Sequence, residues 1–196
     1  MNDPQIRDML LNTFLKKYRT SDNSLILAEV GIMNGNSIVD LAVFSSFYNQ
    51  AFEIKSSEDS LSRLPKQLQD YIQVFDYITV ITQPSHLDEV QRICPKFIGI
   101  LVVYNDWTME YVQKPTASPV VNKKKLIKVL WRDEVYAFLK EKGIKGHSGS
   151  SNAKVKKVAC EIATFQEIRQ LVFKTLKSRI DWKKEFRLNH DVEKVK

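Results

Sequence analysis

The chain has 196 residues, 43% of them hydrophobic and 10% aromatic, which is enough for one buried core with an appendage and argues against disorder. Two isolated cysteines, Cys94 and Cys160, indicate neither a disulfide framework nor a zinc site, and no apolar run reaches the roughly 18 residues of a membrane helix, so we expect a cytoplasmic protein with no membrane partner. The net charge of +7 is uneven, with −4 on residues 1–121 and +11 on residues 122–196.

An N-terminal helix and three apolar strands are predicted for the first part of the chain. Apolar residues at helical spacing, with Pro4 in the first turn, predict a helix over residues 4–19. The strands are expected at residues 24–32, 37–44 and 50–55, and they carry the acidic residues Glu29, Asp40 and Glu53, respectively. Between the first two strands, Asn34-Gly35 tolerates positive φ and predicts a hairpin turn.

The three acidic residues are expected to form one site. Strand side chains alternate, so Glu53 and Lys55 share a face, and these residues alone favour a surface ion pair on an edge strand. The acidic residues on the neighbouring strands favour a shared site instead. Adjacent antiparallel strands are about 4.8 Å apart, so carboxylates on them can converge. Repulsion between two such carboxylates then raises the pKa of one of them, or the pair binds a hard cation such as Mg²⁺. On the second strand, alternation places Ile38, Asp40, Ala42 and Phe44 on one face and Val39, Leu41 and Val43 on the other.

The next elements predict helical crossovers and a mixed sheet. An amphipathic helix is expected over residues 58–75, with Gln67 and Tyr71 on one face because they are four residues apart. Further strands are expected at residues 77–82, 97–103 and 109–113, with a short helix over residues 86–93 between the first two of them. Hairpins combined with helical crossovers indicate an α/β fold with a mixed sheet flanked by helices.

The basic half is predicted to be helical. After a proline-containing linker at residues 114–121, Asn122 is a plausible N-cap for a helix that Gly143 ends, and one or two basic helices run from Ala153 to about Arg187. Lys123, Lys124 and Lys125, with the lysines at 154, 156 and 157, suit contacts to a DNA backbone, although a solvated helical tail explains them equally well. Trp131 is either a core residue or a base-stacking ring.

Several of these residues together resemble a known family. Asp40 followed by Glu53-Ile54-Lys55 is similar to the signature of the PD-(D/E)XK nuclease superfamily, which has the restriction-endonuclease-like fold; Val39 stands where the family name has proline. Gln67-x-x-x-Tyr71 resembles an element of its exonuclease-like branch. The longer EIKS...RLxxQxxxY...VFD pattern resembles that of a group of small bacterial proteins. The resemblance covers roughly residues 25–140 and implies a core over residues 1–118 with a basic helical extension over residues 119–196.

The resemblance also implies roles for particular residues. Asp40, Glu53 and the backbone carbonyl of Ile54 would bind Mg²⁺ or, as a substitute, Mn²⁺, and Glu29 would complete the metal site. Lys55 would orient or help deprotonate the attacking water. The substrate-binding residues would be Gln67, Tyr71, Arg63, Lys66 and the three lysines at 123–125.

These observations lead to one leading hypothesis and two alternatives. The leading hypothesis is a Mg²⁺-dependent DNA nuclease in repair, recombination or mobile-element biology, with Asp40, Glu53 and Lys55 as its catalytic residues. The first alternative is a non-catalytic nucleic-acid-binding module on the same fold. The second is a defence-related interaction protein, and a homodimer or a protein partner stays open in every case.

Overall fold

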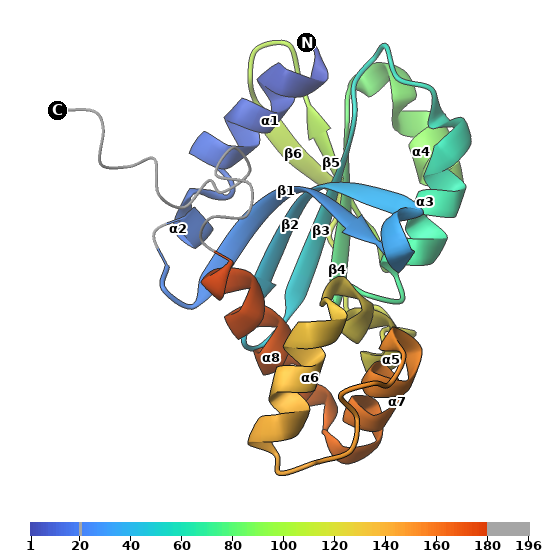
Figure 1. Cartoon of the computed structure of the whole chain (residues 1–196). Helices are drawn as coiled ribbons and strands as arrows, with labels where there is room; N and C mark the ends of the chain where they lie inside the picture. Colours follow the sequence, from blue (N-terminus) through green and yellow to red (C-terminus); the bar gives the residue numbers. More distant parts are fainter. Residues whose placement is uncertain (20, 180–196) are drawn as a thin grey trace, which may run out of the picture.

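A computed structural model describes residues 1–19 and 21–179, whose six strands form one mixed sheet in the order β1-β2-β3-β4-β5-β6 (Figure 1). The strands are β1 (Ser24–Ile32), β2 (Ser37–Ser45), β3 (Asn49–Lys55), β4 (Tyr77–Thr82), β5 (Gly99–Val103) and β6 (Met109–Gln113). Strands β1, β2 and β3 form an antiparallel meander, β3, β4 and β5 are parallel, and β6 is antiparallel to β5. The prediction of an α/β fold with a mixed sheet is confirmed.

Most helices are shorter than predicted, since 3₁₀ turns, loops and polar caps divide the predicted segments. They are α1 (Asp3–Asn12), α2 (Lys16–Arg19), α3 (Leu64–Tyr71), α4 (Leu87–Ile93), α5 (Lys123–Leu126), α6 (Arg132–Glu141), α7 (Asn152–Ile162) and α8 (Phe165–Ser178). The first predicted helix divides at Thr13, whose hydroxyl donates to the Met9 carbonyl. Thr164 begins α8 by accepting a hydrogen bond from Glu167 N. The predicted end near Arg187 lies outside the described residues.

Helices cover both faces of the sheet, which gives three layers. Helix α1 packs on one face, where Ile6 and Leu10 meet Leu41, Phe52 and Ile54 in one buried cluster. The other face is covered by α3, α4 and the helices of the basic half, so it belongs to a second and larger cluster. The charged residues Glu53 and Lys55 point toward this second face, because they alternate with Phe52 and Ile54 along β3.

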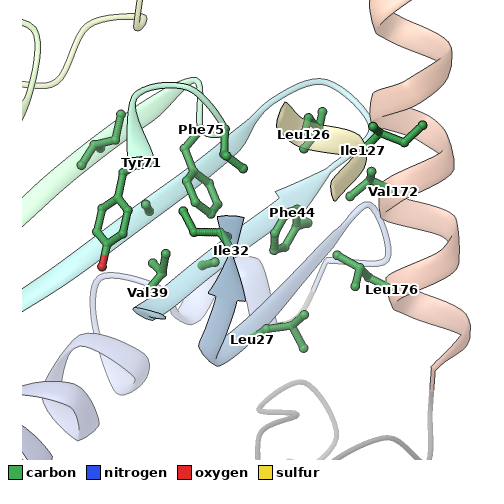
Figure 2. Close-up of a cluster of buried hydrophobic side chains, with 14 of the residues drawn as sticks. Leu27, Ile32, Val39, Phe44, Tyr71, Phe75, Leu126, Ile127, Val172 and Leu176 are labelled. Carbon is green, nitrogen blue, oxygen red and sulfur yellow. The ribbon is translucent and has the colours of Figure 1, made fainter. Parts of the chain in front are cut away.

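The basic half packs against the sheet. Leu126, Ile127, Val172 and Leu176 belong to the same buried cluster as Phe44 of β2 (Figure 2). An ion pair of 2.5 Å between Arg169 Nη2 in α8 and Asp76 Oδ1 before β4 adds a polar contact between the two parts of the chain. These contacts do not test the predicted domain boundary at residue 118, which stays a prediction. Within the described part of the chain, no helix combines the length and apolar character needed to cross a membrane.

The alternation of side chains along β1 and β2 changes at Glu29. This residue has φ of 51°, in the left-handed region, and it reverses the side on which the following residues lie. Ala28 therefore packs with α1, whereas Val30 packs on the opposite face. Across the ladder, Val39 joins Ala42 and Phe44 in the larger cluster, while Ile38 is exposed. The predicted grouping of Ile38 with Ala42 and of Val39 with Leu41 is wrong for this reason. The predicted turn at Asn34-Gly35 is present as a 3₁₀ turn (Met33–Gly35) in which Gly35 has φ of 88°.

Candidate functional site

Asp40 and Glu53 are neighbours because β2 and β3 separate at this point. Leu41 pairs with Phe52 at the end of the ladder, so the next position brings Asp40 toward Glu53. Asp40 Oδ2 accepts the Ile54 amide hydrogen at 2.7 Å, and the carboxylate takes the place of a strand carbonyl. Burial, followed by repulsion from Glu53, raises the pKa of Asp40 to about 7.

Glu53 is held by two side chains in the interior. Its side chain is 1% exposed, and its Oε1 lies 2.6 Å from Lys55 Nζ, whose side chain is 8% exposed. Its Oε2 accepts from the Tyr71 hydroxyl at 2.6 Å, and the same hydroxyl lies 2.6 Å from the Ile38 carbonyl oxygen. Burial and the nearby Glu53 carboxylate raise the pKa of Tyr71, so the phenol stays a donor. Glu53 therefore has a neutralising partner and a hydrogen-bond donor from the chain itself.

Arg7 of α1 is a second internal cation beside the acidic residues. Its guanidinium lies 3.6 Å from Glu29 Oε1 and 3.9 Å from Asp40 Oδ1. The Asp40 contact is at the limit of an ion pair, so it does not offset the burial of that carboxyl. Arg7 was not among the predicted site residues, because nothing in the sequence shows that α1 lies over these strand ends.

The arrangement does not fit a bound divalent cation without rearrangement. Both oxygens of Glu53 are engaged, Asp40 bonds to the backbone, and Glu29 is 47% exposed beside Arg7. Among the described residues, no group of three His, Cys, Asp or Glu side chains is placed to hold a metal ion. Binding of Mg²⁺ or Mn²⁺ by Asp40, Glu53, Ile54 and Glu29 stays a prediction, and it requires Lys55 and Arg7 to move away from the carboxylates.

The predicted substrate-binding residues divide between structural and exposed positions. Gln67 lies beside the cluster, with its Nε2 3.4 Å from the Tyr71 hydroxyl, whereas Arg63 is exposed. Lys66 makes an ion pair of 2.8 Å with Asp70. Lys123 donates to the Ala163 carbonyl at the end of α7 and so joins α5 to α7. Their contacts to substrate remain predictions.

Two lysine-lined hollows lie in the basic half, one among its helices and one between them and the β1–β2 hairpin. One, of about 570 Å³, lies between α5 and α7 and is lined by Lys124, Lys128, Lys156 and Lys157, among others. The second, of about 480 Å³, lies between the β1–β2 hairpin and α7 and shares Lys128 and Lys156 with the first. The described residues 122–179 carry 15 lysines and arginines and five acidic residues. The lysine pair spans two helices, so local sequence spacing could not reveal it.

The fold and these sites define an α/β protein with a partly buried cluster of charged side chains and a basic helical half. A family model described as "Bacteriophage P4 protein cII" matches residues 1–195, and the chain belongs to that family. Protein cII of Enterobacteria phage P4 is 26% identical to this chain over 182 residues, which are 91% of this chain and 68% of the phage protein.

The family overturns the leading functional hypothesis. The match covers nearly the whole chain and is to a phage cII family, not to a nuclease family. The prediction of a Mg²⁺-dependent DNA nuclease is therefore wrong, and the non-catalytic alternative is better supported.

The solved structures leave the finer fold family open. The SPO1766 protein of unknown function from Silicibacter pomeroyi is similar to this chain with a TM-score of 0.42 and 16% identity, over 70% of this chain and 89% of that protein. The restriction-endonuclease-like fold is not confirmed by this similarity.

Proposed function

We propose that this chain binds nucleic acid without cutting it, through the lysines of the basic half. The observation that carries the proposal is the pair of hollows that share Lys128 and Lys156. Lysine contacts to phosphate oxygens are sequence-independent and account for most non-specific affinity. DNA is therefore the proposed partner.

The lysines of the hollows have few acidic neighbours. Lys124 and Lys128 are exposed, and no ion pair within residues 1–19 and 21–179 involves Lys124, Lys128 or Lys156. Lys157 lies 3.9 Å from Glu161, with both side chains more than half exposed. A surface ion pair of this kind stabilises little, so Lys157 can exchange its partner for a phosphate.

The core supports the proposal because its acidic residues already have partners from the chain itself. Lys55 neutralises Glu53, and Arg7 lies beside Glu29 and Asp40. A catalytic metal site needs those carboxylates to face an ion, whereas here they hold α1, β2 and β3 together. We therefore assign the cluster a structural role.

We also propose that the core is a restriction-endonuclease-like scaffold. The support is that the residues carrying the resemblance, Asp40, Glu53, Lys55, Gln67 and Tyr71, belong to three elements and still come together in one cluster. The resemblance then concerns the scaffold and not the reaction.

The proposal is tested by fluorescence anisotropy with labelled single-stranded and duplex DNA, in Mg²⁺ and in EDTA. We expect the same affinity in both buffers, intact DNA on a denaturing gel, and unchanged binding for Asp40→Ala. Lys124→Gln with Lys157→Gln should weaken binding. Absence of binding, or metal-dependent fragments that disappear in Asp40→Ala, would refute the proposal.

A further inference from the structure

The hollow beside the β1–β2 hairpin combines cations with an aromatic ring. On the helical side it is lined by Lys128, Trp131, Arg132 and Lys156, and on the hairpin side by Glu29 and Ile38. Its volume of about 480 Å³ is in the range of pockets that hold small organic ligands. Glu29 is the acidic residue of this wall, and it lies beside Arg7.

Within the described residues, Lys128 and Lys156 of this hollow form no ion pair, although Glu134 attracts Lys156 at longer range. Arg132 is fully engaged, since it donates to the carbonyls of His147, Ser148 and Ser150 and pairs with Asp133. Lys156 is 9% exposed, and its Nζ lies 3.5 Å from the Lys128 carbonyl oxygen. Burial, then repulsion from Lys128, lowers the pKa of Lys156. A partly buried ammonium next to a second lysine is stabilised by an anion placed between them.

Trp131 is held in position although half of its surface is exposed. The residue is 51% exposed, and its backbone amide donates to Glu134 Oε2 at 2.7 Å. The guanidinium of Arg179 lies over the indole ring, 4.3 Å from its centroid, and is itself bound by Glu134. An immobilised aromatic ring loses little entropy when a second planar group packs against it.

A hollow that is lined by both an aromatic ring and two lysines suits a nucleotide better than a lone anion. Lys128 and Lys156 line both hollows. A nucleotide chain that runs from one hollow to the other would therefore pass its phosphates over these two lysines. The ring of Trp131 lines the hairpin hollow beside that pair. In a duplex the bases are stacked inside the helix and cannot reach such a ring, whereas unpaired bases can.

We propose that the hairpin hollow takes one unit of a single-stranded nucleic acid, with the phosphate at Lys128 and Lys156 and the base against Trp131. The proposal rests on the proposed function and specifies its substrate class.

The test compares a labelled single strand with the duplex of the same sequence, using the full chain. We expect the wild type to prefer the single strand, and Trp131→Ala to lose about tenfold in single-strand affinity with little change for the duplex. Trp131→Phe should restore most of the affinity, because it keeps an aromatic face. Lys128→Gln should weaken single-strand binding more than Lys154→Gln, a matched loss of charge on an exposed position of α7 outside both hollows.

Each outcome separates this proposal from the broader one. Equal binding of both DNA forms with no effect of Trp131→Ala overturns the single-strand proposal and leaves nucleic-acid binding standing. A Trp131→Phe variant as weak as Trp131→Ala overturns the stacking role. Circular dichroism confirms that each variant folds, and failure of the folded wild type to bind either form refutes both proposals.

Discussion

At the scale of single residues, the charged groups of the core are paired with one another. Glu53 has Lys55 and Tyr71, and Asp40 has the Ile54 amide. Removing one member of such a buried group leaves the other uncompensated, which is more destabilising than replacing both. The unfolding free energies of variants at these residues therefore test the structural role that we assign to them.

The raised pKa of Asp40 predicts how stability changes with pH. The unfolded carboxyl loses its proton near its ordinary value of 3.8 and the folded one near 7, so its stabilising contribution is present below the lower value and is lost as the pH rises toward 7. Asp40→Asn keeps an acceptor for Ile54 N and removes this loss. Between pH 5 and pH 8, we expect the variant to gain about 2–3 kcal/mol relative to wild type in urea unfolding. A difference that does not change with pH would contradict the burial of this carboxylate.

Lys55 and Glu53 should behave as a coupled pair. Lys55→Met leaves a buried carboxylate without its cation and should lower the unfolding free energy by about 3–5 kcal/mol. Adding Glu53→Gln should recover part of that loss, because the remaining carboxamide is neutral. Denaturant unfolding of the two single variants and the double variant measures the coupling, and additivity within about 0.5 kcal/mol would show that the two side chains do not interact.

At the scale of elements, the β1–β2 hairpin contains two non-glycine residues with a left-handed backbone, Glu29 in β1 and Met33 in the turn. Glu29 has φ of 51°, where a side chain is unfavourable, so Glu29→Gly should raise stability by about 0.5–1 kcal/mol. Glu29→Gln is the control, since it removes the charge facing Arg7 and keeps the strain. Thermal unfolding of the three proteins tests this, and a glycine variant less stable than the glutamine variant would contradict it.

Local sequence patterns were sufficient for much of the sheet. Apolar runs bounded by turn residues located all six strands, and β4 and β6 have the predicted ends because their runs stop at Thr82 and Gln113. Alternation also placed Glu53 and Lys55 on one face. The prediction from alternation failed beyond Glu29, because nothing in the sequence shows that the backbone of this glutamate is in the left-handed region.

Contacts between distant segments could not be predicted from one sequence. Asp40 and Glu53 were expected to meet because their strands are consecutive, and they do. Arg7 comes from a helix far from both in sequence, and the pairing of Lys128 with Lys156 depends on how η4 (Ile127–Val129) and α7 pack. The functional hypothesis was overturned by the family match, which the short signature around Asp40 and Glu53 could not reveal.

At the scale of the whole molecule, the basic half completes the core. Leu126 and Val172 belong to the same buried cluster as Phe44 and Phe75 of the sheet layer (Figure 2). A chain ended at residue 118 would expose that face, so we expect it to aggregate or to lack a cooperative unfolding transition. Circular dichroism with thermal unfolding measures this against the full chain. A soluble 1–118 chain with a sharp transition would show that the core folds independently.

The salt dependence of DNA binding tests the central claim most directly. If the lysines of the two hollows contact phosphates, the logarithm of the affinity should fall linearly with the logarithm of the salt concentration, with a slope of about −0.9 per phosphate contact on duplex DNA. Replacing Lys124, Lys128 and Lys157 by glutamine should make the slope shallower by about two to three units. The same replacement at the exposed residues Lys140, Lys145 and Lys174, outside the two hollows, should change it much less. Equal slopes for the two triple variants, or no affinity at low salt, would contradict nucleic-acid binding by this surface.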